Sequence, residues 1–262
     1  MNKGAHMGYV ISIVNQKGGV GKTTTAVNLG SFLAAKRKKV LILDLDPQGN
    51  ATSGYGFDKM ELENTVYDLL VNEENIENVI QHTNVKNVDM CPTNINLAGA
   101  EVELVSAISR ETILKRAIEP IVDDYDYIII DCPPSLGLLT INALSACEGV
   151  IVPIQGEYYA LEGLTQLIDT INMIKKKLNP VVGILGVVIT MFDSRTQLTK
   201  QVVEEVEKYF GEKVFKTHIP RNVRLAEAPS HGKTIGDYDP KSKGAIAYQA
   251  LAQEVIKRTK DR

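Results

Sequence analysis

A glycine-rich segment near the beginning of the chain combines the residue types and the spacing of a phosphate-binding loop. Residues 16–24 read Gln-Lys-Gly-Gly-Val-Gly-Lys-Thr-Thr. In such a turn the backbone N–H groups can surround phosphate oxygens, and the following helix adds the positive end of its dipole. Lys22 is placed to reach the β- and γ-phosphates, and the Thr23 hydroxyl to bind Mg²⁺. The predicted phosphate-binding residues are Gly18, Gly19, Val20, Gly21, Lys22, Thr23 and Thr24.

This loop has two irregular positions and a favourable context. Gln16 stands where the usual loop has a glycine, and a second lysine, Lys17, follows it. The loop comes after the apolar run Tyr9–Val14 and before a helical pattern at residues 22–36. A strand on one side and a helix on the other favour a phosphate cradle over a basic glycine turn that binds nothing.

Carboxylates follow two other apolar runs. Asp44 and Asp46 lie in the segment Leu-Asp-Leu-Asp-Pro-Gln-Gly-Asn at residues 43–50, and Asp131 closes the run that begins at Ile128. An isolated Asp at such a place is often a turn or cap residue. Beside a glycine loop in the same sheet, it is suited to hold Mg²⁺ directly or through water. Asp46 is the candidate for orienting the attacking water, whereas Asp44 could serve either the loop lysine or the metal.

Apolar runs alternate with amphipathic segments along the whole chain. The strand candidates are Tyr9–Val14, Val40–Leu45, Val88–Cys91, Tyr127–Asp131, Val150–Pro153 and Ile184–Ile189. The helix candidates are Lys22–Lys36, Arg110–Ile118, Leu136–Cys147, Leu161–Leu178 and Leu198–Phe210. Strands that are apolar on both faces predict an α/β fold: one domain with a mainly parallel twisted sheet and helices on both faces. Ligands in such sheets bind beyond the carboxyl ends of the strands, where the polar residues above are found.

Composition sets the broad limits. The chain has 262 residues, of which 44% are apolar and 23% charged, and its net charge of −3 argues against a uniformly basic surface but not against a local one. Residues 1–7 look like a cloning remnant, and we expect residues 8–262 to form the domain. Scattered cysteines without paired spacing indicate a cytoplasmic protein with reduced thiols.

The three polar motifs together resemble one family. Residues 17–23 are similar to the deviant Walker A loop of the ParA/MinD superfamily, with the Asp-Leu-Asp-Pro-Gln-Gly-Asn turn at 44–50 and Asp-Cys-Pro-Pro-Ser at 131–135 as its companions. In this combination the chain resembles ParA (Soj-type) chromosome partition ATPases, from Tyr9 to the last helix. Gln16 and the turn at 44–50 favour the partition branch over MinD. The resemblance implies a P-loop ATPase that uses ATP/ADP and Mg²⁺ and hydrolyses ATP slowly by itself.

The same resemblance assigns roles to residues. It implies an ATP-bound sandwich homodimer in which Lys17 contacts the phosphates of the partner while Lys22 serves its own nucleotide. Asp46 resembles the hydrolytic aspartate, Thr23 the Mg²⁺ ligand and Asp131 the Walker B carboxylate. Pro220 and Asn222 resemble the segment beside the adenine.

The resemblance also implies partners. ATP dimers of the family bind double-stranded DNA without sequence preference, and the matching positions here are Arg195, Arg224 and, more weakly, Lys233. Without the resemblance, each would be an ordinary solvated surface charge. A ParB-like protein is the implied stimulator, and the implied location is cytoplasmic and nucleoid-associated.

Two other classes of function stay open at this point. A MinD-type ATPase would end in an amphipathic membrane helix. Here the last helical pattern, residues 245–256, has a modest apolar stripe rich in alanine, and the basic segment after it, residues 257–262, offers no bulky apolar wedge. We therefore expect core packing for this stripe and no stable membrane association. A nucleotide-dependent scaffold that positions cargo would keep Lys17 and Lys22 but need little turnover.

Overall fold

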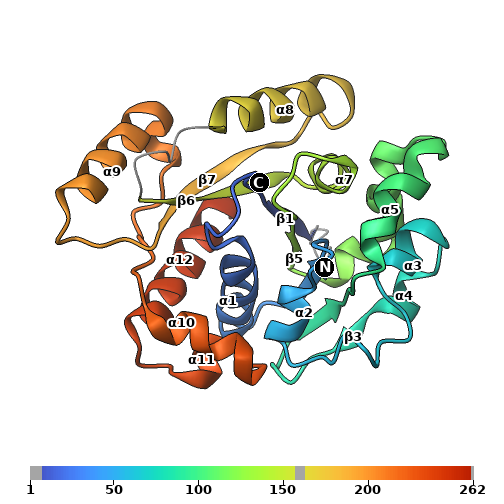
Figure 1. Ribbon diagram of the computed structural model, residues 1–262, viewed down its shortest axis with the longest axis horizontal. Helices are drawn as coiled ribbons and strands as arrows, with labels where there is room; N and C mark the ends of the chain where they lie inside the picture. Colours follow the sequence, from blue (N-terminus) through green and yellow to red (C-terminus); the bar gives the residue numbers. More distant parts are fainter. Residues whose placement is uncertain (1–7, 157–162, 261–262) are drawn as a thin grey trace, which may run out of the picture.

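A mainly parallel β-sheet forms the centre of the structure (Figure 1). The computed structural model describes residues 8–156 and 163–260, and in this part of the chain the sheet has seven strands in the order β3-β4-β2-β5-β1-β6-β7. The strands are β1 (Tyr9–Ile13), β2 (Val40–Asp44), β3 (Gln81–His82), β4 (Val88–Cys91), β5 (Tyr127–Asp131), β6 (Gly149–Gln155) and β7 (Gly183–Thr190). Neighbouring strands run parallel except for β3 and β4. The expected cloning remnant, residues 1–7, lies outside the described residues.

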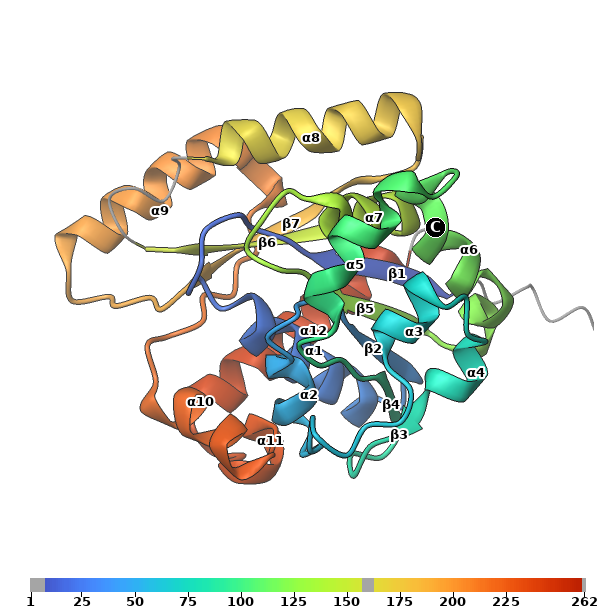
Figure 2. The same ribbon diagram turned by 45° about the vertical axis from the view of Figure 1, so that its right-hand side comes forward.

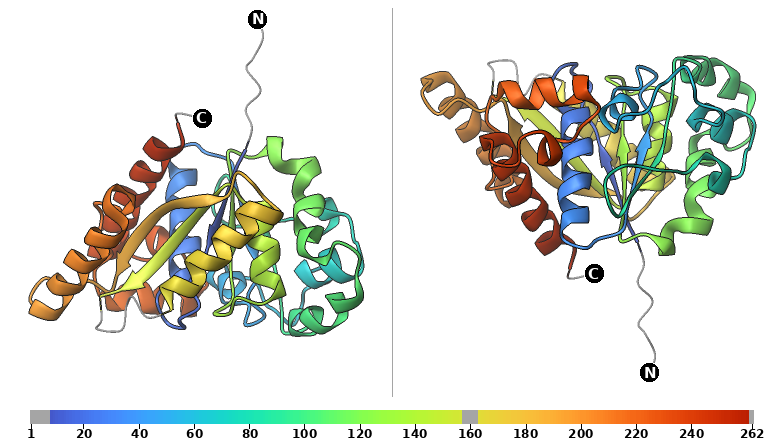
Figure 3. Two further views of the ribbon diagram at one scale, coloured as in Figure 1. Left: turned by 90° about the horizontal axis from the view of Figure 1, so that it is seen from above. Right: turned by 90° about the horizontal axis from the view of Figure 1, so that it is seen from below.

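Helices cover both faces of this sheet, as Figure 3 shows from above and below. One layer consists of α1 (Lys22–Ala35), α2 (Asn50–Gly54), α10 (Val223–Glu227), α11 (Ile235–Tyr238) and α12 (Lys243–Thr259). The other consists of α3 (Val66–Val71), α4 (Ile76–Val79), α5 (Leu97–Glu103), α6 (Ile113–Ile118), α7 (Leu138–Ala146), α8 (Leu164–Lys177) and α9 (Gln197–Phe210). Short 3₁₀ helices are η1 (Leu104–Ser106), η2 (Arg110–Thr112), η3 (Glu119–Asp124), η4 (Gly211–Lys213) and η5 (Ala228–His231). The predicted α/β fold class is confirmed.

The central strands are buried along their whole length. In β2, Leu41 and Leu43 join the core under one helix layer, whereas Val40 and Ile42 join the core under the other. This division follows from the alternation of side chains along a strand. Since both faces are covered, the strand has to be apolar at every position, and this is why it reads as a continuous apolar run in the sequence.

The C-terminal helix α12 packs along α1. Its residues Tyr248, Leu251 and Val255 are buried, and the Tyr248 hydroxyl lies 3.2 Å from Thr25 Oγ1 of α1. The predicted core-packing role of its apolar stripe is confirmed. In the described part of the chain, no helix is both long enough and apolar enough to cross a membrane.

The short elements are the part of the fold that the sequence pattern does not predict. Six helices, α2 to α5, α10 and α11, have only four to seven residues, too few for a periodic signal. Three of them, α3, α4 and α5, pack together (Figure 2). The predicted helix Arg110–Ile118 begins as a 3₁₀ turn and becomes α-helical at Ile113. The described part of the predicted helix Leu161–Leu178 begins at Leu164, after Gly163 with a φ of 84°.

Candidate nucleotide-binding active site

The glycine loop connects β1 to α1, as predicted. Gly19 and Gly21 have φ values of 74° and 87°, a left-handed conformation that glycine adopts without strain. Gly21 is the N-cap of α1, where no side-chain cap and no acidic residue occupies the first turn in the described structure. The N–H groups at this helix start are therefore available to an anion.

Side chains from distant elements fix the shape of the loop. Asn15 Oδ1 accepts the Lys17 N–H at 3.0 Å, while its Nδ2 donates to the carbonyl of Pro153 in β6 at 2.8 Å. Thr190, at the end of β7, donates its hydroxyl to the Val20 carbonyl at 2.8 Å. The loop is thus held from two neighbouring strands. Sequence reasoning missed both anchors, although an Asn directly after a strand is a signal that could have suggested the first.

Lys22 lies inside the loop and close to the carboxylates of the strand ends. Its side chain is 6% exposed, and Nζ donates to the Lys17 carbonyl at 3.1 Å. Burial lowers the pKa of Lys22, and the nearby charges of Asp131 and Asp46 oppose that shift. When a nucleotide binds, the Lys22 ammonium group can therefore replace its bond to the Lys17 carbonyl by a bond to a phosphate oxygen.

Asp131 is a fully buried carboxylate at the end of β5. Neither of its oxygens has a hydrogen-bond partner in the described structure, although the Thr23 hydroxyl is close enough to lower its pKa. Burial, and then the neighbouring charge of Asp44, raise the pKa of Asp131 well above its usual value. A buried carboxylate without a partner calls for an explanation, and a bound cation is one.

The donors around Asp131 fit Mg²⁺. In the residues that the structure describes, no three His, Cys, Asp or Glu side chains gather to hold a metal. A cation here would take Thr23 and Asp131 from the protein and its other oxygens from phosphates and water, which is the usual environment of Mg²⁺. The chemistry of the donor set therefore fits the predicted magnesium site.

Asp44 lies opposite Asp131 in the sheet register. In the described structure its carboxylate, unlike that of Asp131, is bound by hydrogen-bond donors of nearby residues. It accepts hydrogen bonds from the Thr52 N–H at 2.8 Å, the Thr52 hydroxyl at 2.7 Å and the Asp46 N–H at 3.2 Å. Burial raises the pKa of Asp44 to about 7, and the bonds from Thr52 oppose this shift. A metal role for Asp44 stays a prediction.

Asp46 occupies a tight turn that is fixed on both sides. Its side chain is 7% exposed, and its Oδ1 accepts the Gln48 N–H at 3.0 Å. Its carbonyl accepts the Gly49 N–H at 2.8 Å, and Gly49, with a φ of 61°, is the N-cap of α2. A Cβ at position 49 would lie 2.9 Å from the Thr93 carbonyl oxygen, so the turn needs glycine there.

A cavity of about 330 Å³ adjoins the glycine loop. Gly21 and Thr24 line it from the loop and α1, and Pro220 and Asn222 from the segment before α10. The structure thus brings the predicted base-binding residues next to the predicted phosphate-binding residues. The side chain of Asn222 caps α10 by accepting the Arg224 N–H at 2.9 Å, which leaves mainly backbone groups and its amide nitrogen for a base.

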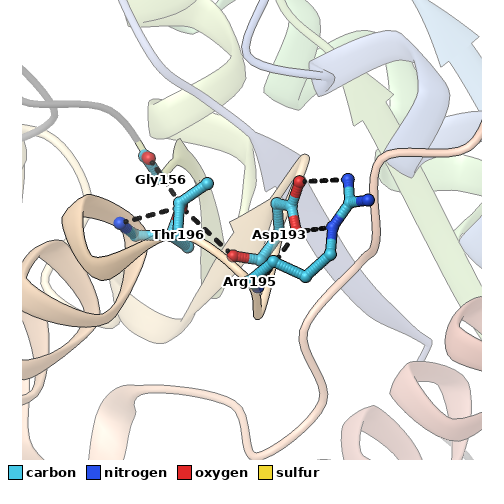
Figure 4. Close-up of polar contacts among 5 residues, drawn as sticks. Gly156, Asp193, Arg195 and Thr196 are labelled. Atoms are coloured by element: carbon cyan, nitrogen blue, oxygen red, sulfur yellow. Dashed lines mark hydrogen bonds and ion pairs between the residues drawn. The ribbon is translucent and has the colours of Figure 1, made fainter.

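The predicted DNA-contacting arginines lie on two segments that meet beside this cavity. Phe192, after β7, forms a β-bridge with Pro220. Arg195 is 86% exposed and binds both carboxylate oxygens of Asp193, at 2.9 and 2.8 Å (Figure 4). These bonds lower the pKa of Asp193 to about 2.

The second arginine has acidic partners as well. Arg224 contacts Glu227 at 2.9 Å and Asp239 at 3.6 Å. Lys233 is exposed and follows the 3₁₀ helix η5. Both arginines therefore have a carboxylate partner within their own segment of the structure, which the sequence reasoning did not predict.

Comparison with known proteins identifies relatives of the whole chain. A family described as an AAA domain matches residues 8–184. The sporulation initiation inhibitor protein Soj of Bacillus subtilis (strain 168) is 61% identical over 249 residues, covering 95% of this chain and 98% of that protein. The chromosome-partitioning ATPase Soj of Treponema pallidum (strain Nichols) is 50% identical over 252 residues, covering 96% and 98%.

The chain belongs to the ParA (Soj-type) family of partition ATPases. The predicted resemblance is confirmed. Among solved structures, cobyrinic acid a,c-diamide synthase from Mycobacterium smegmatis with bound ADP and magnesium superimposes with a TM-score of 0.86 at 37% identity, covering 98% of this chain and 97% of that one. That structure shows that the ParA-like fold accommodates an adenine nucleotide and magnesium together.

The buried carboxylate pair Asp44 and Asp131 should make the free energy of unfolding depend on pH and on Mg²⁺. Because the pKa values of Asp44 and Asp131 are raised on folding, the folded state binds more protons than the unfolded state above pH 4. Without ligands, the free energy of unfolding should therefore fall as pH rises from about 4 to 7, by up to about 1.4 kcal/mol per pH unit for each carboxyl group. Urea unfolding across this range measures the slope.

Mg²⁺ with ADP should flatten this dependence, since a cation favours the charged carboxylates. The matched variant is Asp131→Asn, which removes one of the two acids while keeping the shape of the side chain. It should show a smaller slope than the wild type without ligands. An equal slope in the variant and the wild type would contradict the assignment of the pH dependence to this pair.

Proposed function

We propose that this chain is an ATP-hydrolysing dimeric switch for chromosome or plasmid partitioning, whose ATP-bound dimer binds DNA without sequence preference. The observation that carries the proposal is the meeting of Lys22, Asp46 and Asp131 at the carboxyl ends of β1, β2 and β5, with Asp131 lacking a hydrogen-bond partner in the described structure. Membership of the ParA family supports ATP and Mg²⁺ as the ligands of this site.

Each residue of the site has a task in hydrolysis. Lys22 donates to the β- and γ-phosphate oxygens, and Thr23 and Asp131 hold Mg²⁺. When bound, the ion neutralises negative charge on the phosphates. Asp46 accepts a hydrogen bond from the attacking water and orients it toward the γ-phosphate. We propose that this hydrolysis is slow in the chain alone and that a ParB-like partner accelerates it.

The surface around Lys17 supports the proposed dimer. Lys17 is half-buried beside the exposed Gly18 and Gly19, and with Gln16, Ser135 and Gln166 it borders a hollow of about 560 Å³. A Cβ at Gly18 would meet none of the described residues within 4 Å. A second copy can approach this open part of the loop, so that Lys17 of one chain reaches phosphates bound by the other. A charge delivered across the interface couples nucleotide binding to dimerisation.

Arg195, Arg224 and Lys233 are the proposed DNA contacts, and the chain is proposed to work on the nucleoid in the cytoplasm. Exposed ion pairs such as those of Arg195 and Arg224 contribute little to stability, because water and salt screen the two charges. DNA phosphates can therefore replace the carboxylate partners at little cost. Dimerisation doubles the number of contacts, and backbone contacts add up without reading the bases.

A DNA mobility assay with ATP, ADP and no nucleotide tests the switch. Binding is expected with ATP and not with ADP, because only the ATP dimer presents both basic surfaces. The affinity should fall steeply with salt, with a slope of about −0.9 in log–log form for each phosphate contact. Equal binding with ADP and ATP would contradict the switch.

Two further measurements separate the alternative functions. Liposome flotation with ATP tests a MinD-type membrane ATPase, and we expect no flotation because the apolar face of α12 is buried against α1. Steady-state phosphate release, with and without DNA, tests a scaffold that positions cargo. Phosphate release that stays undetectable even with DNA and a ParB-like partner would favour the scaffold.

A further inference from the structure

Thr52 is a fully buried residue of α2 whose side chain joins three separate segments. Its hydroxyl donates to Asp44 Oδ2 at 2.7 Å, and its backbone N–H donates to the same oxygen at 2.8 Å. The same hydroxyl accepts the N–H of Thr93, after β4, at 2.9 Å. One hydroxyl group is therefore used both as donor and as acceptor, and it ties the end of β2 to α2 and to the segment after β4.

This bridge continues to Asp46. The other oxygen of Asp44, Oδ1, accepts the Asp46 N–H at 3.2 Å. Thr52 and Asp44 thus close the turn of residues 45–51 at its base, and Asp46 lies inside this closed turn. Thr52 and Asp44 are fully buried and Asp46 is 7% exposed, whereas Gln48 and Asn50 at the tip of the turn are exposed. Because the bonds at the base lie in a low-dielectric interior, loss of one of them leaves polar groups unpaired and lets the turn shift.

The nucleotide cradle is built from other contacts. Asn15 and Thr190 fix the glycine loop from β6 and β7, and neither contacts Thr52. Thr52 is also absent from the residues that line the base cavity in the described structure. A change at Thr52 should therefore displace Asp46 while the phosphate and base contacts keep their places.

We propose that Thr52 is a positioning residue for ATP hydrolysis, which holds the Asp46 turn in its productive place through the buried Asp44 carboxylate. This inference rests on the proposed function, since it assumes that Asp46 orients the attacking water. A displacement of about 1 Å at a reacting group can reduce a rate about 100-fold without loss of binding. Thr52 therefore affects kcat and leaves the KM for ATP nearly unchanged.

The test compares Thr52→Val, which removes the hydroxyl at nearly constant volume, with Thr52→Ser, which keeps it. Steady-state phosphate release should fall about 10- to 100-fold in Thr52→Val, with an affinity for ADP within about threefold of the wild type. Thr52→Ser should restore turnover to within about threefold of the wild type.

The matched control is Thr234→Val. The Thr234 hydroxyl is also buried and also used twice, since it donates to Asp237 at 2.8 Å and lies 3.2 Å from Ser31 Oγ, but it has no contact with Asp44. This variant should keep the turnover of the wild type. It separates a positioning effect from the general cost of losing a buried hydroxyl.

Three results of the turnover measurement overturn the positioning role. They are normal turnover in Thr52→Val, an equal loss in Thr234→Val, and a loss in Thr52→Ser as large as in Thr52→Val. Thr52→Ala replaces the valine variant if that protein does not fold. If neither variant binds ADP while Thr234→Val does, Thr52 serves the fold and the proposal fails. Absence of phosphate release from the wild type would instead contradict the proposed function itself.

Discussion

Replacing Asp46 by alanine is expected to abolish ATP turnover, with a loss of at least about 100-fold, while ATP still binds. The reason lies in the division of the site. Lys22 and Thr23 of the glycine loop serve the phosphates, whereas Asp46 comes from the turn after β2 and is held there by Gln48 and Gly49. Removal of its carboxylate leaves the cradle intact but leaves the attacking water without an orienting acceptor.

Steady-state phosphate release measures the loss, and titration with a non-hydrolysable ATP analogue measures binding. The Asp46→Ala protein should also stay on DNA in the presence of ATP, because its dimer does not turn over. Asp123→Ala is the matched control, since Asp123 is an exposed carboxylate in η3 before β5, away from the strand ends that carry the site. Release at the wild-type rate by Asp46→Ala would remove Asp46 from the mechanism.

The second large effect is expected at Arg224. Arg224→Glu should abolish DNA binding at physiological salt, with a loss of at least about 100-fold, because a dimer loses two phosphate contacts and phosphate contacts act cumulatively. The new carboxylate would also stand beside Glu227 and repel phosphate. ATP-dependent dimerisation, measured by sizing, should be unchanged.

A charge-matched control separates a contact from general electrostatics. Lys115→Glu makes the same change of charge at an exposed position of α6, in the other helix layer. It should lower DNA affinity only slightly. If Arg224→Glu loses dimerisation together with DNA binding, the residue supports the fold through its contacts with Glu227 and Asp239 instead of binding DNA.

The sequence predicts those parts of the site that are formed by residues adjacent to one another in the chain. The glycine loop and the strand-end carboxylates Asp46 and Asp131 are recognisable because each motif lies within one strand and the turn after it. All six predicted strands match the observed ones or differ from them by at most two residues at either end, since a buried parallel strand is an unbroken apolar run. The largest difference is at β6 (Gly149–Gln155), which is longer than the predicted Val150–Pro153.

Contacts between distant residues have no such local signal. Asn15 meets Pro153 across 138 positions, Thr190 meets Val20 across 170, and Thr93 meets Thr52 across 41. Asn15 is distinguished only by its place after a strand, which does not identify its partner, and the threonines look like any polar residue until the sheet brings the strand ends together. The packing of the sheet therefore determines which hydroxyl groups anchor the site, and a single sequence does not record it.

Two exposed ion pairs affect the rate at which the protein would encounter DNA. They join Arg195 to Asp193 and Arg224 to Glu227. An arginine next to a carboxylate is nearly neutral as seen from a distance, and at physiological salt charges are screened beyond about 8 Å. With a net charge of −3, the chain has little field to draw a polyanion toward it. The protein would then meet DNA at the rate of ordinary diffusion. The preference of DNA for the ATP-bound dimer would come from contacts that form after the encounter and from the lifetime of the complex.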